Sequence, residues 1–295
     1  MNLQRRKQRL FFDMKKIGLV DYYVSEWHAN NYPTWIREIS GQSGGEFEVA
    51  YAWAELETSP LDGVTTAQWC ANMGVAQCET IAELCEKSDA IIVLAPSNPE
   101  THLRYAEAVL PFGKPTYIDK TFAPNEEIAS KIFELARQHD TPIFSTSALR
   151  FAEELKKFAD VQNLIVTGGG SNLEEYVIHM VELALILLQD RVSQVTAIPQ
   201  GRQRLFRLLT ERGKNATLIF TPRMPFILES ESSDAKMTYA AVKSDFFRCL
   251  MRTILQFFET GDAPVDPSQT LEVMRVRDAI LSADFQAEDC VPRFV

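Results

Sequence analysis

The segment KKIGLVDYYVSEWHA, residues 15–29, begins like the first strand of a nucleotide-binding domain. Its apolar run, residues 17–20, follows two lysines and has the composition of a strand buried on both faces of a parallel sheet. Such domains place glycines directly after this strand, because glycines allow a tight turn and let the backbone approach a pyrophosphate closely. Here the turn carries two carboxylates and two tyrosines instead, and no glycine. The segment therefore predicts the strand of such a fold without its usual phosphate-binding turn.

Composition limits the class of protein. The chain has 295 residues, 46% hydrophobic and 24% charged, which is usual for a soluble globular protein of about two domains. Its net charge of −10 argues against nucleic acid as a partner, since binding to phosphates needs clustered cations on one face. No apolar run reaches the ~18 residues of a membrane span, so we expect no membrane association. A basic cluster at residues 5–9 belongs to a predicted N-terminal tail, residues 1–13, which is excluded from the fold.

Cysteine usage indicates the redox compartment. The five cysteines include no C-x-x-C pair and follow no secretory segment, so we expect reduced thiols and a cytoplasmic protein. No set of histidines, cysteines and carboxylates has the spacing of a metal site, so no metal is expected. The absence of a G-x-S-x-G turn disfavours the hydrolases that use that nucleophile.

The first half of the sequence alternates strand and helix patterns. Short apolar runs have the composition of buried strands at residues 16–20, 47–53, 90–94, 116–118 and 142–145. Helical patterns lie between them at residues 27–39, 66–73, 81–87, 100–110 and 125–139. This rhythm predicts a Rossmann-like domain over residues 14–146, with a doubly wound parallel sheet.

The second half, residues 147–295, changes character. Strand patterns separated by turns occur at residues 163–167, 194–198, 205–210, 216–221 and 226–230. Helical patterns occur at residues 174–188, 245–259 and 268–283. We predict an α+β domain with an open, mainly antiparallel sheet, whose last helix is a candidate to pack back on the first domain. The three glycines at residues 168–170 suggest a turn or a substrate-lining loop more than a phosphate cradle.

Two residues are candidates for proton chemistry. Lys120 follows a short predicted strand, and the ends of parallel strands form the ligand crevice in open α/β sheets. His179 lies four residues after Glu175 on a predicted helix, so a carboxylate on the same helical face is available to orient its imidazole. Tyr176 adds a hydroxyl nearby. The alternatives are a surface lysine in a loop and a histidine satisfied within an apolar core.

The segment SDAIIVLAPSNPETHLRYAEAVLPFGKPTYIDKTFA, residues 88–123, resembles the Gfo/Idh/MocA oxidoreductase family. In that family the third main strand ends in a small residue and a proline, a histidine follows on the next helix, and a G-K-x-x-x-x-E-K-P signature comes after. STSALRF, residues 145–151, resembles the crossing into the family's second domain, and residues 245–283 resemble its closing helices. The resemblance covers residues 15–283.

The resemblance implies an oxidoreductase that acts on a secondary alcohol of a sugar, inositol or related polyol, with NAD or NADP as cofactor. Lys120 and His179 would be catalytic, and Glu175 would replace the aspartate of the family's D-x-x-x-H motif. Tyr176 would contact the substrate together with Lys120 and His179. The E-K-P signature reads Asp119, Lys120 and Thr121 here, so the proline that the family often holds in cis is missing. Pairing through the second sheet would give a homodimer or homotetramer.

The cofactor residues implied by the resemblance gather at the ends of the first strands. They are Asp21, Tyr22, Tyr23, Glu55, Pro96, Ser97, Asn98, His102 and Asp119. The family's glycines align with Asp21, with Tyr23 and with a position near Glu26. A carboxylate at the start of a helix suits the helix dipole but repels phosphate. Glu55 is at best a weak ribose ligand.

Three hypotheses follow for this cofactor region. An oxidoreductase with altered cofactor binding predicts an open groove with free backbone N–H groups at residues 24–27. A non-catalytic ligand-binding or regulatory protein on the same scaffold predicts that Tyr22, Tyr23 and Trp27 fill the pyrophosphate site. A cofactor-independent lyase or isomerase would use Lys120 and His179 on a carbonyl substrate.

Overall fold

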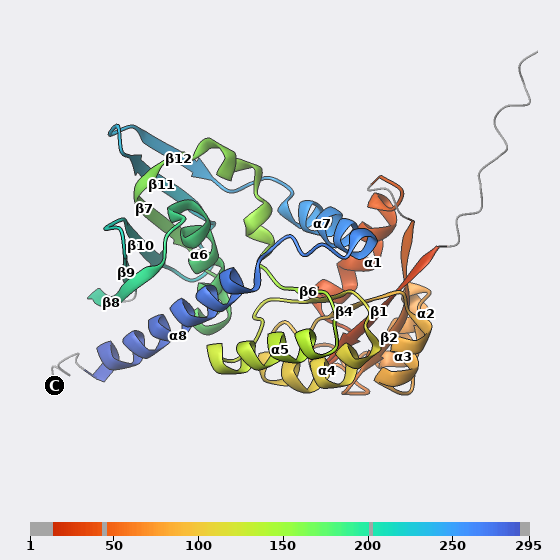
Figure 1. Cartoon of the computed structure of the whole chain (residues 1–295). Helices are drawn as coiled ribbons and strands as arrows, with labels where there is room; N and C mark the ends of the chain where they lie inside the picture. The colour runs from red at the N-terminus through yellow and green to blue at the C-terminus, as the bar shows by residue number, and fades with distance from the viewer. Residues whose placement is uncertain (1–13, 43–45, 201–202, 290–295) are drawn as a thin grey trace, which may run out of the picture.

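The computed structural model describes residues 14–42, 46–200 and 203–289, which form two sheets with helices around them (Figure 1). The predicted tail, residues 1–13, lies outside the described residues. The chain completes the first sheet before it enters the second, and its last two helices then pack along both parts.

The first sheet is parallel throughout, as the alternating pattern predicts. Its order is β3-β2-β1-β4-β5-β6. The strands are β1 (Lys15–Asp21), β2 (Phe47–Ala54), β3 (Ala76–Gln77), β4 (Ala90–Val93), β5 (Thr116–Ile118) and β6 (Ile143–Phe144). The strand order reverses between β1 and β4, which places the ligand crevice of such sheets outside the carboxyl ends of these two strands.

Five helices flank the first sheet: α1 (Trp27–Ile39), α2 (Thr66–Met73), α3 (Ile81–Lys87), α4 (His102–Val109) and α5 (Glu126–Gln138). Four of them begin after a residue whose side chain accepts a backbone N–H of the first turn, namely Glu26, Thr65, Thr80 and Asn125. The helix predicted over residues 100–110 is divided into η1 (Pro99–Thr101), α4 and η2 (Leu110–Phe112). Pro111 ends the α-helical hydrogen bonding because it has no N–H.

The second sheet is mixed and mainly antiparallel, as predicted. Its order is β12-β11-β7-β10-β9-β8, and only the β7–β10 pair is parallel. The strands are β7 (Val161–Gly168), β8 (Val192–Gln200), β9 (Gln203–Thr210), β10 (Asn215–Phe220), β11 (Ile227–Ser232) and β12 (Met237–Ala241). The sequence pattern does not predict β3 or β12, because these short edge strands bury a single side chain between them, that of Ala240.

Three longer helices complete the fold (Figure 1). The helix α6 (Leu173–Leu188) covers one face of the second sheet and packs on β7 and β10. The helix α7 (Phe246–Thr260) returns to the first part and packs against α1, and α8 (Pro267–Asp289) contacts α5, α6 and β8. Two 3-10 segments, η3 (Ala148–Phe151) and η4 (Glu153–Lys157), connect the two sheets. The contact between α8 and α5 places the last helix against the first part of the molecule.

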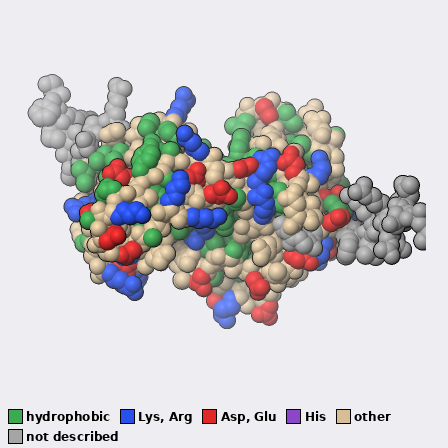
Figure 2. Space-filling view, turned by 90° about the horizontal axis from the view of Figure 1, so that it is seen from above, with side chains coloured by type: hydrophobic (Ala, Val, Ile, Leu, Met, Phe, Trp, Pro, Cys, Tyr) green, Lys and Arg blue, Asp and Glu red, His purple; other side chains and the backbone are tan. Residues whose placement is uncertain are grey.

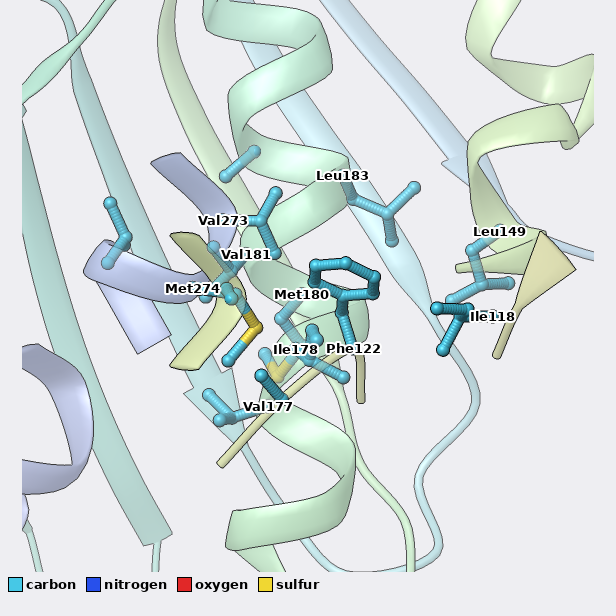
Figure 3. Close-up of a cluster of buried hydrophobic side chains, with 14 of the residues drawn as sticks. Ile118, Phe122, Leu149, Val177, Ile178, Met180, Val181, Leu183, Val273 and Met274 are labelled. Atoms are coloured by element: carbon cyan, nitrogen blue, oxygen red, sulfur yellow. The ribbon is translucent and has the colours of Figure 1, made fainter. Parts of the chain in front are cut away.

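A continuous apolar cluster joins the two parts of the molecule. Phe122 and Leu149 meet the apolar face of α6 and the side chains of Val273 and Met274 from α8 (Figure 3). Burial of each such side chain stabilises the fold by roughly 1.5–3 kcal/mol relative to exposure. The surface seen in Figure 2 carries basic and acidic side chains interspersed with one another. The shared core fixes α6 relative to β5, and the candidate site lies between these elements.

Candidate functional site

A pocket of about 320 Å³ lies where α1, α6 and α7 approach the carboxyl end of β5. Its polar lining comes from both halves of the chain: His28, Asp119, Lys120, Ser147 and His179. Its aromatic lining consists of Trp27, Tyr32, Tyr176, Phe226, Phe246 and Phe247. The structure therefore brings the predicted catalytic pair, Lys120 and His179, to one pocket together with the predicted substrate contact Tyr176.

Lys120 reaches the pocket from the loop after β5. Its Nζ atom lies 3.5 Å from the backbone oxygen of Pro96, at the end of the neighbouring strand β4. The Lys120–Thr121 peptide bond is cis, although threonine stands where the family signature has proline. Lys120 thus lies between the carboxyl ends of β4 and β5, where open parallel sheets bind their ligands.

His179 faces the pocket from α6 and is oriented by a hydroxyl. Its Nδ1 atom lies 2.7 Å from Oγ of Ser147. Burial, and then the nearby positive charge of Lys120, lower the pKa of His179 to about 3. The imidazole is therefore neutral at neutral pH, and its Nε2 atom is the ring nitrogen not engaged by Ser147.

A buried carboxylate, Glu182, holds the segment that carries Ser147. Glu182 accepts a hydrogen bond from Ser147 N at 2.8 Å and another from the Thr146 hydroxyl. It also forms an ion pair with Arg150 Nε at 2.7 Å, and both side chains are largely buried. The sequence signal for this residue is a lone carboxylate within the apolar run of residues 177–188. Sequence reasoning missed Glu182 and Ser147, because their roles depend on contacts between α6 and η3.

Glu175 is not the residue that orients His179. Its carboxylate accepts hydrogen bonds from Ser97 Oγ at 3.2 Å and from Asn172 Nδ2 at 3.1 Å. The prediction of a Glu175–His179 pair is therefore corrected, since Ser147 takes that position. Glu175 instead connects the start of α6 to the loop after β4, across the two parts of the molecule.

The glycines at residues 168–170 shape two walls of the pocket. A Cβ atom on Gly170 would lie 2.0 Å from the ring of Tyr176, and one on Gly168 would lie 2.3 Å from the ring of Phe226. The rings of Tyr176 and Phe226 lie 5.8 and 5.9 Å from the imidazole of His179, centroid to centroid. The glycines thus allow two aromatic side chains to pack around His179.

Asp119 is a buried carboxylate at the base of the pocket, with 1% of its surface exposed. Its Oδ1 atom accepts from the Tyr117 hydroxyl at 3.0 Å and from the Tyr32 hydroxyl at 3.5 Å. Burial and the charge of Asp119 raise the pKa of both tyrosines well above the usual value, so both remain hydroxyl donors. Its Oδ2 atom has no hydrogen-bond partner and lies 3.8 Å from Nε2 of His28.

The N-terminus of α1, where a Rossmann-type fold binds phosphate, is occupied by Glu26. The Glu26 carboxylate accepts hydrogen bonds from the backbone N–H groups of His28, at 2.8 Å, and Ala29. Trp27 is 50% exposed and its ring packs on Phe247 of α7 at 4.7 Å. The region is therefore neither the open groove nor the aromatic plug that the two hypotheses predict, because a carboxylate of the chain itself satisfies the helix donors.

Asp21 ends β1 at the position of the first family glycine and is 1% exposed. Its Oδ1 atom accepts from the backbone N–H groups of Tyr22, at 2.7 Å, and Ala95, at 2.9 Å, while Oδ2 has no partner. Burial first, and then the charge of Glu26, raise the pKa of Asp21 well above its usual value. Burial and the charges of Asp21 and Glu26 likewise raise the pKa of Tyr23.

Two further predicted cofactor residues are engaged within the protein. Glu55 accepts from the Tyr105 hydroxyl at 2.7 Å and forms an ion pair with Arg104, so its carboxylate is not free for a ribose. His102 is fully buried, with its ring nitrogens 3.0 Å from the backbone oxygen of Phe122 and 2.7 Å from that of Leu94. Burial lowers the pKa of His102. In this structure both side chains are engaged with protein groups, and the ligand contacts predicted for Glu55 and His102 stay predictions.

The loop after β4 joins the first part of the molecule to α6. Pro96 offers its carbonyl oxygen to Lys120, and Ser97 donates to Glu175. The Asn98 side chain donates to Glu100 at 3.0 Å. Ser97 is exposed, and Pro96 and Asn98 are partly buried.

The residues around α1 do not fit the pyrophosphate of NAD or NADP. Two N–H groups of the first helical turn are already bound to the Glu26 carboxylate. A phosphate close to that carboxylate would meet a repulsion of order 4 kcal/mol for unit charges about 4 Å apart in a protein-like medium. Asp21 adds a second acidic group where the glycine turn would approach the cofactor.

A larger groove of about 800 Å³ lies between the end of α6 and α8. Its basic side chains Arg150, Arg191 and Arg275 all form ion pairs, Arg150 with Glu182 and the other two with Glu272. None of the predicted catalytic, substrate or cofactor residues lines it. We therefore place the functional site at the smaller pocket. Within the described residues, no three histidine, cysteine or acidic side chains are grouped to hold a metal ion.

Comparison with solved structures identifies the class of fold. The structure of scyllo-inositol dehydrogenase from Lactobacillus casei with bound NAD(H) and scyllo-inositol has a TM-score of 0.75 at 14% identity, covering 92% of this chain and 96% of that one. UDP-N-acetylglucosamine 3-dehydrogenase from Acidithiobacillus ferrooxidans has a TM-score of 0.73 at 14% identity, covering 91% and 97%. A protein described as a "probable dehydrogenase" from Thermotoga maritima has a TM-score of 0.75 at 12% identity, covering 94% and 100%.

The chain has the two-domain fold of sugar and inositol dehydrogenases of the Gfo/Idh/MocA type. The resemblance found in residues 15–283 is thereby confirmed at the level of the fold. No family model matches the sequence, and no curated protein sequence is significantly similar to it. At this level of identity the similarity establishes architecture, and residue roles are argued from the pocket itself.

Proposed function

We propose that this protein is an oxidoreductase of the sugar and polyol class, acting on a CH–OH group of a sugar, inositol or related polyol. The observation that carries the proposal is the convergence of Lys120 and His179, from the two halves of the chain, on one pocket. The shared fold supports it, because inositol dehydrogenases of this fold have been solved with NAD(H) and an inositol bound.

The pocket offers complementary partners to a hydroxyl group. Lys120 donates hydrogen bonds, and neutral His179 accepts one at Nε2 in the tautomer whose Nδ1–H donates to Ser147. A ligand hydroxyl can accept from the first and donate to the second. A secondary alcohol between them is held for removal of its proton, with Ser147 fixing the ring of His179. The rings of Tyr176 and Phe226 supply apolar surface for the CH groups of such a ligand.

The cofactor proposal is more specific, and Glu26 constrains it. An oxidoreductase of this fold would use NAD or NADP as hydride carrier. Because the Glu26 carboxylate occupies the N-terminus of α1, we propose that the dinucleotide binds weakly or through contacts other than that helix end. The same observation favours a second candidate function, a non-catalytic ligand-binding or regulatory protein that keeps the polyol pocket and has lost the cofactor.

Titration of the purified protein with NAD(H) and NADP(H), by calorimetry and nicotinamide fluorescence, separates the two candidates. A panel of inositols and hexoses, with reduction of NAD+ or NADP+ followed by absorbance, then tests the reaction. The oxidoreductase proposal expects turnover that falls at least tenfold in K120A and in H179N, with the surface variant K131A as a control. Polyol binding without affinity for either dinucleotide at millimolar concentration would support the second candidate and refute the first.

We also propose a homodimer or homotetramer formed through the uncovered face of the second sheet. Directly paired residues share a face of a sheet, and one such row includes Tyr239, Glu229, Ile165 and Arg207, all exposed. Sedimentation of the wild type and of I165D tests this proposal. A wild-type monomer, or an oligomer unchanged by I165D, contradicts it.

None of the helices in the described ranges is both long and apolar enough to cross a membrane.

A further inference from the structure

A second polar cluster, formed by Glu26, His28 and Asp119, lies on the α1 side of the pocket. His28 and Asp119 both line the pocket. The Nδ1 atom of His28 lies 3.0 Å from Oε2 of Glu26, and its Nε2 atom lies 3.8 Å from Oδ2 of Asp119. His28 thus stands between two carboxylates, one of which caps α1.

The hydrogen bond to Glu26 fixes the tautomer of His28. An ionised carboxylate only accepts hydrogen bonds, so the proton of the neutral ring lies on Nδ1. The Nε2 atom then carries a lone pair and is the ring nitrogen presented to Asp119 and the pocket. Rings of Trp27 and Tyr32 hold the imidazole in place, with centroids at 5.1 and 5.6 Å.

Two hydrogen-bond acceptors therefore face each other at the pocket wall. Neither can satisfy the other, and a separation of 3.8 Å is too long for a hydrogen bond even if the ring carries both protons. The Oδ2 atom of Asp119 is buried and has no partner within the protein. Buried polar atoms are nearly always hydrogen-bonded, so an unpartnered one in a pocket wall needs a donor from outside the chain, a bound water that a ligand displaces or the ligand itself.

We propose that Nε2 of His28 and Oδ2 of Asp119 form a subsite for two adjacent hydroxyl groups of the ligand, a vicinal diol. Each hydroxyl donates one hydrogen, and the two acceptors receive one each. An ammonium group also donates more than one hydrogen, but Lys120 lines the same pocket and opposes a cationic ligand. The inference rests on the proposed function for the ligand class, and adds which ligand groups bind and where.

Glu26 has two roles in this arrangement. Its carboxylate takes the helix donors that a phosphate would use, and the same Oε2 atom orients His28. Glu26 is a positioning residue for the subsite, and His28 and Asp119 are the ligand contacts. The same residue, Glu26, thus takes the place of the phosphate and orients the diol subsite.

The test uses the imidazole signals of the full chain, in which four histidines are to be assigned by NMR. In the free protein His28 is expected as the Nδ1–H tautomer, and this preference should disappear in E26A, which has no acceptor at that position. The probes are cis-1,2-cyclohexanediol, cyclohexanol and cyclohexylammonium, followed by scyllo-inositol and myo-inositol. We expect the diol to shift the His28 signal and to bind at least tenfold more tightly than cyclohexanol, with that advantage lost in D119N and in H28F but kept in H139Q.

Each other outcome has a defined meaning. An Nε2–H tautomer of His28 in the free protein, equal affinity for the diol and cyclohexanol, or tighter binding of cyclohexylammonium overturns the subsite. If inositols shift His179 but not His28, the proposed function stands and the subsite is refuted. If inositols shift neither histidine, the polyol function itself is refuted. Should D119N fail to fold, H28F and the tautomer of the wild type decide the question.

Discussion

Replacement of Asp21 by asparagine should stabilise the protein at neutral pH. The Asp21 carboxyl is almost fully buried, with one oxygen bound to two backbone N–H groups and the other unpartnered. Asparagine keeps the oxygen that accepts from Tyr22 and Ala95, and removes the charge that Glu26 opposes. The amide NH2 takes the place of the unpartnered oxygen, so the gain comes from removal of the charge and amounts to about 1.4 kcal/mol for each unit by which the pKa of Asp21 is raised.

The gain should depend on pH in a defined direction. The pKa of Asp21 is raised in the folded state, so its carboxyl favours folding below the unfolded pKa of about 4 and opposes it as pH rises. The gain from D21N should therefore be small near pH 4 and grow as pH rises through the raised pKa.

Urea unfolding followed by tryptophan fluorescence, near pH 4 and at neutral pH, measures the effect. The exposed residue Asp262 supplies the control, since D262N should leave the unfolding midpoint unchanged. If D21N destabilises the protein equally at both pH values, the bonds to Tyr22 and Ala95 outweigh the charge, and the account of Asp21 is wrong.

Three further predictions concern the pocket and its support. The pKa of His179 is lowered to about 3. Below about pH 6.5 this imidazole therefore binds a proton in the unfolded chain and not in the folded chain. Between pH 7 and about pH 5 the wild type should lose about 2 kcal/mol more unfolding free energy than H179N, and equal losses would refute the burial of a neutral imidazole. E182Q should lower the free energy of unfolding by about 3 kcal/mol, because Arg150 loses its buried partner. E134Q, at an exposed ion pair, should leave it unchanged, and equal effects of the two variants would contradict the supporting role of Glu182. G170A should displace the Tyr176 ring, lowering polyol affinity and costing about 1–3 kcal/mol of stability, and unchanged affinity would show that Tyr176 is not a wall of the ligand site.

The sequence predicts the first sheet well because its signals are local. The apolar run of β1 is buried on both faces, and α2, α3 and α5 begin at polar residues that cap them. The edge strands β3 and β12 carry no such signal, because almost none of their side chains are buried.

The candidate site shows the limit of sequence reasoning more clearly. Lys120 and His179 were predictable because a motif and a helical position mark them. Ser147, Glu182 and the unpartnered oxygen of Asp119 owe their roles to contacts between segments far apart in the chain. Glu175 lies one helical turn before His179, yet tertiary contacts direct it to Ser97. Spacing within a helix therefore identified a possible pair, and packing between the two sheets decided the actual one.

The central claim is that the Glu26 carboxylate stands where the phosphates of a dinucleotide would bind. Calorimetric titration of NADH into the wild type and into E26G, with E38A as a surface control, tests it directly. Removal of the carboxylate frees two helix N–H groups and takes away a charge of the same sign as the phosphates. E26G should therefore bind NADH at least tenfold more tightly than the wild type, and E38A should not. Tight binding by the wild type that is unchanged or weakened in E26G would contradict the claim.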